Sequence, residues 1–448
     1  MKRFIMIGCL SWLLVFSLTS CSRSEAKSES NIAYGQVVKT DENTITVESG
    51  KYKYGDKFRG SGEEISYNLP ENVFFDDFKK GDIVAVLLDG KDAVAVTGVN
   101  STSEETAVKS GSASIDSLIS TDGEEKEVCD EEYSLADDNK AAVLALNDGG
   151  RIDMSRVGVN TDGSSSAGIY AAAGGAVYGS QVNLETSGSR SSALVTGDSL
   201  SMIDFSDSTL QTSGDRSSCV ASSGNVSLTN VTGTSYNGPA VVIDRGGVVN
   251  LKNTSIVCSN ESAVEISGYL NDDKKAVTSK LMVDNSSLKS GNGSSLIKIS
   301  GTDGSVKMIN SNVISESNIL AEVKSDESNR GGKLLLYGIG QNFEGDITCD
   351  KNSKIKVVLT EDSSFIGTLN NAGTAKYSKI YLSADSYWTL KGDSYAGSIS
   401  NEDKSCGNID SKGYNIYYDK DNLANDWLDG RTVELNGGGK LMPSDEKQ

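Results

Sequence analysis

Short apolar stretches recur at a nearly regular interval from residue 130 onward. Each stretch follows a polar turn, and the first three turns begin at Thr161, Thr186 and Thr212 with the phrase Thr-x-Gly. Looser copies of the turn begin at Thr234, Cys258, Ser290 and Ser315. Alternating strands such as 182–184 precede the turns, so that each interval of about 24 residues holds two or three strands. A period of this length is typical of one coil of a parallel β-helix.

A second register of residues supports the same interpretation. Asn or Asp precedes a strand at comparable places in successive coils, and these side chains tolerate the left-handed backbone of a sharp corner. The residues are Asp207, Asn230, Asn253, Asn285 and Asn310. The chain has only three prolines, which would remove hydrogen bonds from a sheet. We therefore expect a right-handed parallel β-helix of about 12 coils over residues 129–442, with a charged insertion at 271–275.

Residues 31–99 show a different pattern of short alternating strands separated by tight polar turns. Strands are predicted at 36–38 and 44–47, and the turn at 80–82 precedes another. About six strands in this length favour a small closed barrel. The phrases Gly-Gln-Val, Ile-Thr-Val and Gly-Asp-Ile-Val are similar to those of OB-like barrels in bacterial envelope proteins. Residues 100–128, rich in Ser, Thr, Glu and Gly, predict an acidic linker.

The first thirty residues have the pattern of a secretory signal. Lys2 and Arg3 precede an apolar run, and the following Leu-Thr-Ser-Cys21 resembles a bacterial lipobox. We expect residues 1–20 to be removed, Cys21 to be lipidated, and residues 21–30 to form a polar tether. An ordinary signal peptide with an incidental cysteine is the alternative, and the run is too short to span a membrane. The expected location is the cell envelope, outside the cytoplasm, with the lipid on Cys21 in the membrane.

Charge and composition then narrow the chemistry. The chain has 42 Lys and Arg against 62 Asp and Glu, a formal net charge of −20, and no histidine. The negative charge argues against nucleic-acid binding, which depends on clustered basic side chains. The missing histidine excludes Ser-His-Asp and Cys-His catalytic sites and imidazole metal sites. The cysteines are widely spaced without a Cys-x-x-Cys pair, which favours buried free thiols over a disulfide framework or a metal site.

Two arginines at matching positions of neighbouring coils are the main polar candidates. Arg190 and Arg216 are expected to stack on one face, and Asp215 lies beside Arg216. A solvated ion-paired face is the simpler interpretation, and a small site for an anionic sugar is the alternative.

A calcium site would need several acidic side chains close together, and no motif of this chain indicates such a group, so we expect no cofactor. The turn that contains Asp162 matches polygalacturonase-like hydrolases, but the other residues of that pattern are absent and no catalytic residue is assigned.

Aromatic residues concentrate in residues 377–442, which include Trp388 and Trp427. A solenoid needs a cap over the open end of its core, and bulky side chains are suited to that role. A platform on which sugar rings stack is the alternative, and it would make both tryptophans ligand contacts.

Two phrases carry a wider resemblance. They are the coil phrase Thr-x-Gly-x-x-Ser-x-Ala and the sequence Ala-Asp-Ser-Tyr-Trp-Thr-Leu-Lys-Gly-Asp-Ser-Tyr at 384–395. The chain resembles adhesin-like secreted β-helix repeat lipoproteins of anaerobic gut bacteria, within the pectate-lyase-like and pertactin-like superfamily. This resemblance implies a protein displayed at the cell surface, and it carries over neither an activity nor a catalytic residue.

Three functional hypotheses follow from the sequence. The leading one is a non-enzymatic surface lipoprotein, adhesin-like or polysaccharide-binding, whose partner is a glycan or another surface protein. The second is a polysaccharide lyase or glycoside hydrolase that uses carboxylates or Arg and Lys. The third is a passive structural spacer.

Overall fold

The computed structural model describes residues 32–41, 44–51, 58–68, 78, 80–89, 92–99, 115–268 and 277–444. Within these residues the chain is all-β apart from one short 3-10 helix, η1 (Leu423–Leu428). The predicted signal peptide, Cys21, the tether and the charged insertion lie outside the described residues.

The N-terminal part forms a five-stranded antiparallel sheet in the order β3-β2-β1-β4-β5. Its strands are β1 (Ile32–Asp41), β2 (Thr44–Lys51), β3 (Arg59–Asn68), β4 (Ile83–Asp89) and β5 (Asp92–Val99). Val37, Ile45, Val47, Val84 and Val86 form its core. The described pairings do not join β3 to β5, so they establish an antiparallel sheet, and its closure into a barrel stays a prediction.

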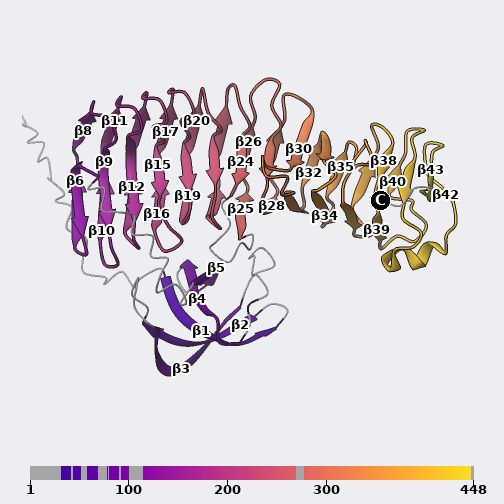
Figure 1. The fold of residues 1–448 in the computed structure, drawn as a ribbon, viewed down its shortest axis with the longest axis horizontal. Helices are drawn as coiled ribbons and strands as arrows, with labels where there is room; N and C mark the ends of the chain where they lie inside the picture. Colours follow the sequence, from indigo (N-terminus) through magenta and orange to yellow (C-terminus); the bar gives the residue numbers. More distant parts are fainter. Residues whose placement is uncertain are drawn as a thin grey trace, which may run out of the picture.

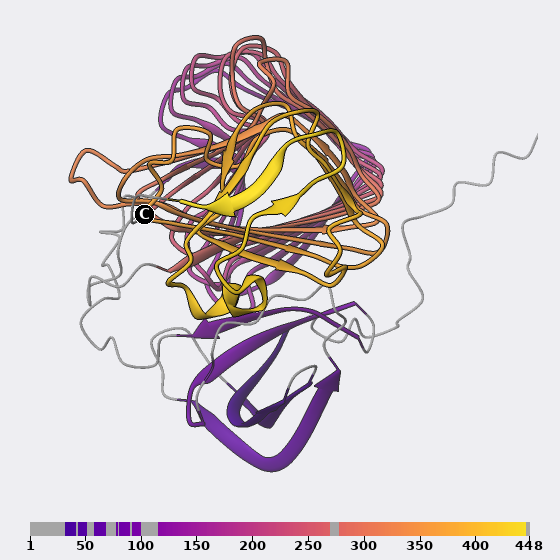
Figure 2. The same ribbon diagram turned by 90° about the vertical axis from the view of Figure 1, so that its right-hand side faces the viewer.

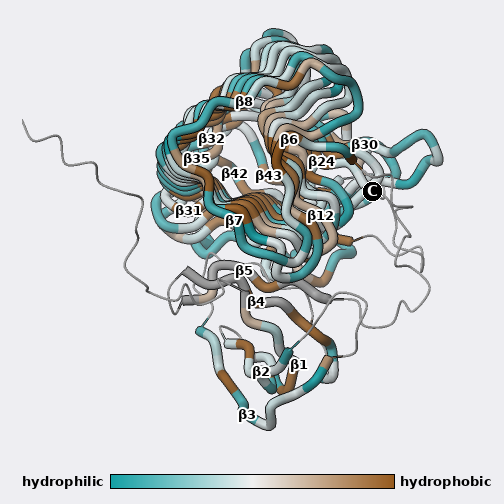
Figure 3. The backbone as a smooth tube through the Cα atoms, turned by 90° about the vertical axis from the view of Figure 1, so that its left-hand side faces the viewer, coloured by the Kyte–Doolittle hydropathy of each residue, from teal (hydrophilic) through white to brown (hydrophobic). Residues whose placement is uncertain are grey.

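The rest of the described chain is a parallel β-solenoid of about 13 turns (Figure 1). Three long parallel sheets run along it, with twelve, eight and ten strands, and each strand pairs with its counterpart in the next coil. The predicted parallel β-helix is confirmed. Figure 3, viewed from one end, shows the stacked coils enclosing a common interior.

The strands of the solenoid divide among five sheets. The twelve-stranded sheet contains β7 (Glu125–Cys129), β10 (Arg151–Ser155), β13 (Ala176–Ser180), β16 (Met202–Ser206), β19 (Asn225–Thr229), β22 (Val248–Lys252), β25 (Thr278–Asp284), β28 (Asp303–Ile309), β31 (Lys333–Ile339), β34 (Lys354–Thr360), β36 (Tyr377–Leu382) and β39 (Ser398–Asn401). The eight-stranded sheet contains β8 (Glu132–Leu135), β11 (Gly158–Thr161), β14 (Asn183–Thr186), β17 (Thr209–Thr212), β20 (Thr232–Ser235), β23 (Ser255–Cys258), β26 (Ser287–Lys289) and β29 (Asn312–Ile314). The ten-stranded sheet contains β6 (Ser117–Asp122), β9 (Ala141–Leu146), β12 (Ala167–Ala172), β15 (Leu194–Thr196), β18 (Val220–Ser222), β21 (Val241–Ile243), β24 (Val264–Ser267), β27 (Ile297–Ser300), β30 (Ile319–Lys324) and β33 (Asp346–Cys349). Two short sheets complete the C-terminal coils, with β32 (Asn342–Glu344), β35 (Ser364–Ile366), β37 (Tyr387–Thr389) and β40 (Ile409–Asp410) in one and β38 (Ser394–Tyr395), β41 (Ile416–Tyr418), β42 (Val433–Glu434) and β43 (Lys440–Pro443) in the other.

Alternation within each strand explains the solenoid core. In β16, for example, Ile203 and Phe205 point inward and are fully buried, while Asp204 between them points outward. Equivalent inward positions of neighbouring coils pair in register. Ile203 lies beside Val177 of the preceding coil and Val226 of the following coil. Apolar side chains thus form continuous rows along the axis, and removal of this surface from water is the main stabilising contribution.

The corners of the coils use the left-handed backbone that the second register predicted. All five residues of that register have positive φ: Asp207 (49°), Asn230 (57°), Asn253 (50°), Asn285 (46°) and Asn310 (45°). Asn and Asp adopt this conformation at lower cost than other non-glycine residues, which explains their recurrence at one position per coil.

The solenoid begins before the expected boundary. β6 and all of β7 except its last residue lie within residues 100–128, the range predicted as linker, and both strands pair with those of the next coil. This first coil presents mostly polar side chains, and its buried apolar residues include Ile119 and Val128. Because this coil has few apolar residues, its strands could not be predicted from the sequence. Its strands nevertheless pair in the same register as those of later coils.

The small N-terminal sheet packs against the middle of the solenoid, below β16 to β25 in Figure 1 and in the end view of Figure 2. Ile83 and Leu200 form a buried contact between the two parts, with Tyr34 and Phe58 packed against it. Lys280 of β25 is 3% exposed and donates a hydrogen bond from Nζ to the carbonyl oxygen of Val96 at 3.3 Å. The twelve-stranded sheet is therefore covered in its middle coils.

Candidate functional site

The predicted arginine pair does lie at equivalent corners of neighbouring coils. Arg190 and Arg216 both have positive φ, and the Arg190 amide donates to the Asp215 carbonyl at 2.7 Å. The side chains of Arg216 and Asp215 are 72% and 75% exposed, and their charged atoms are 4.0 Å apart. An exposed pair of this kind stabilises a protein by at most about 1 kcal/mol. The two arginines thus lie at corners of neighbouring coils that stack one on the other, as the repeat predicted.

The two tryptophans have different environments, and neither presents an open platform. Trp388 has no exposed surface; it stacks on Phe365 with ring centroids 5.8 Å apart and donates from Nε1 to the carbonyl of Gly367. Trp388 thus points into the solenoid and packs the C-terminal coils, as in the interpretation of these aromatic residues as a cap, and its ring offers no surface for the alternative sugar platform. Trp427, on η1, is partly buried against the core and lies under the Lys404 ammonium group at 4.5 Å.

The described cysteines are free thiols. Cys219, Cys258, Cys349 and Cys406 are buried, whereas Cys129 is partly exposed. Burial raises the pKa of Cys219 to about 12. The prediction of buried thiols holds for Cys219 and Cys258, and a thiol with so high a pKa is a poor nucleophile at neutral pH.

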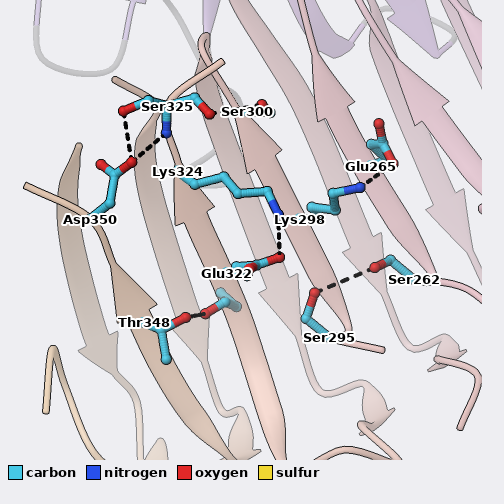
Figure 4. Close-up of polar contacts among 11 residues, drawn as sticks. Ser262, Glu265, Ser295, Lys298, Ser300, Glu322, Lys324, Ser325, Thr348 and Asp350 are labelled. Carbon is cyan, nitrogen blue, oxygen red and sulfur yellow. Dashed lines mark hydrogen bonds and ion pairs between the residues drawn. The ribbon is translucent and has the colours of Figure 1, made fainter. Parts of the chain in front are cut away.

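The ten-stranded sheet carries a row of polar side chains on its outer face (Figure 4). Glu265, Lys298, Glu322 and Thr348 occupy the same position in β24, β27, β30 and β33. Lys298 Nζ lies 3.1 Å from Glu265 Oε2 in the neighbouring coil, and Lys324 pairs with Glu322 at the same distance. We call these four register-matched residues the polar row. Its members are about 4.8 Å apart along the solenoid, the spacing of neighbouring strands.

The polar row ends beside a shallow open depression of about 480 Å³. Its lining residues are polar: Ser325, Asp326, Asn329, Asp350, Lys351, Asn352 and Thr374. They come from the turns that follow β30 and β33 and from the turn before β36, so equivalent corners of three coils build it. Ser325 donates to Asp350 from both its backbone amide and its hydroxyl, each at 2.7 Å, as drawn in Figure 4.

The carboxylates of this depression are held ionised. Burial opposes ionisation of Asp350, but hydrogen bonds from Ser353 and Ser325 outweigh it and lower the pKa to about 2. Burial also opposes ionisation of Asp326, and its hydrogen bonds with Arg330 outweigh that effect and lower its pKa. Both groups therefore act as hydrogen-bond acceptors at neutral pH and hold no proton to donate to a leaving group. The arrangement is suited to binding hydroxyl or amide groups.

Replacing Asp350 with Asn is expected to lower the free energy of unfolding at pH 7 by about 1–2 kcal/mol, because the amide accepts fewer hydrogen bonds. In the native chain the pKa of Asp350 is lowered to about 2, so its contribution is complete above about pH 5 and is lost progressively as the pH falls through about 2. Chemical denaturation between pH 7 and 2 measures both effects. The control is D162N, because the Asp162 side chain is exposed in a turn and its loss should change little. Equal effects of D162N and D350N would contradict the assignment.

The polar row was not predicted, although the sequence contains a signal for it. Each of its coils places one polar residue between apolar neighbours: Val264-Glu-Ile, Ile297-Lys-Ile and Ala321-Glu-Val. The middle residue of such a triplet faces outward on a strand whose neighbours face the core. Only the register between coils shows that these middle residues adjoin one another.

The part of the chain that the structure describes contains no group of three or more Asp, Glu and Cys placed to hold a metal ion. None of its helices is long and apolar enough to cross a membrane. Comparisons with protein-family models, with curated proteins and with solved structures found no match for this chain.

Proposed function

We propose that the protein is a non-enzymatic, lipid-anchored surface protein whose β-helix binds a glycan. The observation that carries the proposal is the polar row with its adjoining depression: hydrogen-bonding groups repeat once per coil on an outer face of the solenoid. A polymer of similar repeats could contact several coils at once, and many weak contacts of this kind add up to useful affinity.

The chemistry of the row suits a carbohydrate. Glu265, Lys298, Glu322 and Thr348 supply both donors and acceptors, which match the hydroxyl groups of a sugar. Asp350 and Asn352 extend the same set of groups into the depression. Glu265 and Lys298 are paired with each other, and Glu322 is paired with Lys324. A neutral hydroxyl can therefore join their hydrogen bonds without leaving an unpaired charge.

The hydrolase or lyase hypothesis has less support. A general acid needs a carboxyl group whose pKa is raised towards neutrality. Every described carboxyl group with a shifted pKa is shifted downward: Asp130, Asp326, Asp350, Glu402, Asp403 and Asp410. These groups are ion-paired or hydrogen-bonded to turns, which is typical of structural carboxylates.

Location at the cell surface follows from the lipobox-like sequence that ends at Cys21. A lipid on this cysteine would hold the chain at the membrane, and the polar residues 21–30 would separate the lipid from the folded part. The solenoid would then project into the medium, where polysaccharides are available.

A glycan array, together with pull-down on insoluble plant polysaccharides and on mucin, tests this proposal. We expect the purified chain to bind at least one polysaccharide, and the double variant K298A/E322A to bind it more weakly. The matched control is K289A/E316A, a pair at 2.7 Å between β26 and the turn after β29, away from the polar row. Binding to no glycan would refute the proposal, and cleavage of a bound polysaccharide would refute its non-enzymatic part.

A further inference from the structure

The C-terminal coils of the twelve-stranded sheet present a regular arrangement of outward side chains. In β31, β34 and β36 the inward positions are fully buried, and the alternate positions face outward. Strand pairing places these outward residues in three rows along the solenoid. The rows are Lys333, Lys354 and Tyr377; Leu335, Lys356 and Lys379; and Tyr337, Val358 and Tyr381. We call these nine residues the lysine–tyrosine face.

Positive charge on this face is largely uncompensated. Lys333 is paired with Asp303 at 3.1 Å, but Lys354, Lys356 and Lys379 have no carboxylate partner among the described residues. Lys356 and Lys379 are direct neighbours in adjacent strands. Burial, followed by the like charges of Lys379 and Lys333, lowers the pKa of Lys356. Four lysines therefore gather on one surface of a chain whose net charge is −20.

Aromatic side chains border these charges. Tyr377 lies in the same row as Lys333 and Lys354 and is 39% exposed. Tyr337 and Tyr381 occupy the third row, separated by Val358. The Tyr381 hydroxyl is held by Glu402, whose hydrogen bond raises the pKa of Tyr381 to about 12, so its ring has a fixed position. The face thus combines cations with rings that can pack against the C–H groups of a sugar.

The covered part of the sheet ends where this face begins. Lys280, Ser305 and Lys307 also point outward but are 2–3% exposed, and Lys280 contacts the N-terminal sheet through Val96. The next coils contain Lys333 and Lys354, which are exposed. The lysine–tyrosine face is therefore a surface that the protein leaves open beside its docked N-terminal part.

We propose that the lysine–tyrosine face binds an anionic polysaccharide, with Lys354, Lys356 and Lys379 contacting its acidic groups and Tyr377 packing against a sugar ring. This rests on the proposed function and specifies both a second site and the class of glycan. Lys356 and Lys379 are about 4.8 Å apart along the solenoid, close to the length of one sugar residue in an extended chain. A polymer with one charge per sugar fits that spacing.

Charge density favours a polysaccharide over a nucleic acid. Duplex DNA carries a charge about every 1.7 Å, and its affinity for a protein comes largely from the neutralisation of many phosphates by Lys and Arg. The face supplies four lysines, and the rest of this acidic chain repels a polymer of such high charge density. In the free protein, repulsion from the neighbouring ammonium groups of Lys379 and Lys333 disfavours the charged form of Lys356. An anion bound over Lys356 relieves this repulsion.

The test compares binding of the full chain to polygalacturonate, which carries carboxylates, dextran sulfate, which carries sulfates, and neutral dextran. We expect binding to one or both acidic polymers but not to dextran, and weaker binding as salt rises. The triple variant K354E/K356E/K379E should lower the affinity about tenfold or more, and K354Q/K356Q/K379Q should lower it less. The matched control, K126E/K391E/K420E, changes the charge equally at exposed sites elsewhere and should change the affinity less than about threefold.

Further measurements test whether the tyrosine ring contributes to binding and whether the face prefers a polysaccharide to a nucleic acid. Y377S should weaken binding to the acidic polysaccharide, whereas Y387S, at an exposed tyrosine outside the lysine–tyrosine face, should leave it unchanged. Equal losses in both triple variants, or equally tight binding to poly(dT), would overturn the inference. Binding of a neutral glycan without any binding of the two acidic polymers would also overturn it and leave the proposed function standing. Binding to no glycan at all would refute both.

Discussion

Replacing Trp388 with Ala is expected to lower the free energy of unfolding by about 3–5 kcal/mol, the range for removing a large buried aromatic side chain. Trp388 has no exposed surface, stacks on Phe365 and bonds to the Gly367 carbonyl, so the substitution leaves a cavity and an unpaired buried acceptor. Because Phe365 and Trp388 lie in neighbouring coils, the loss weakens the contact between those coils. Urea denaturation followed by circular dichroism measures the effect.

The adjacent residue provides a matched control. Tyr387 precedes Trp388 on the same strand but faces outward with 54% of its surface exposed. Y387A should change the free energy of unfolding by no more than about 0.5 kcal/mol. If Y387A and W388A were equally destabilising, the assignment of inward and outward faces in β37 would be wrong.

Replacing Gly214 with Ala is expected to cost about 3 kcal/mol or more, because overpacking against backbone has no flexible neighbour to absorb it. A Cβ at this position would lie far inside van der Waals contact with the carbonyl group of Gly188, the equivalent glycine of the preceding coil. Gly188 has the same relation to the carbonyl of Gly163. The repeated Thr-x-Gly phrase therefore reflects stacking of one turn directly on the next.

A glycine whose added Cβ would meet a single side-chain methyl group, and no backbone, separates this effect from the general cost of replacing glycine. At Gly392 a Cβ would meet one methyl group, that of Thr368, at 3.1 Å. G392A should therefore change stability by about 1 kcal/mol or less. Thermal unfolding of G214A and G392A compares the two sites. Near-equal midpoints would contradict the account of close stacking between the turns.

The coil repeat could be predicted because burial imposes it on the sequence. Residues such as Ile203 and Val226 recur at inward positions, and residues such as Asn230 recur at corners with positive φ. The first coil was missed because its strands carry few apolar residues, of which Ile119 and Val128 are buried. Pairing to the next coil, rather than its own composition, holds that coil in the solenoid.

The surface sites could not be predicted in the same way. Lys356 and Lys379 are far apart in the sequence and become neighbours only through the pairing of β34 with β36. The alternative for Trp388 stayed open for a related reason. The phrase Tyr-Trp-Thr alternates, and a shift of one residue decides whether its tyrosine or its tryptophan faces the core. Packing constrains exposed positions only weakly, so the residue types at these positions do not repeat regularly from coil to coil. Only the pairing of strands in the structure shows which exposed residues are neighbours.

The docked N-terminal sheet has a consequence for cooperativity. A coil of a solenoid contacts only its two neighbours, and such a structure can open one coil at a time from an end. Leu200 and Lys280 both contact the N-terminal sheet, although they belong to different coils with two others between them. The N-terminal sheet therefore holds these coils together. They must unfold together, or the N-terminal sheet must dissociate from them first. Amide hydrogen exchange should therefore be uniformly slow over the coils that the N-terminal sheet holds together. The C-terminal coils, which carry the lysine–tyrosine face, should open locally and exchange faster.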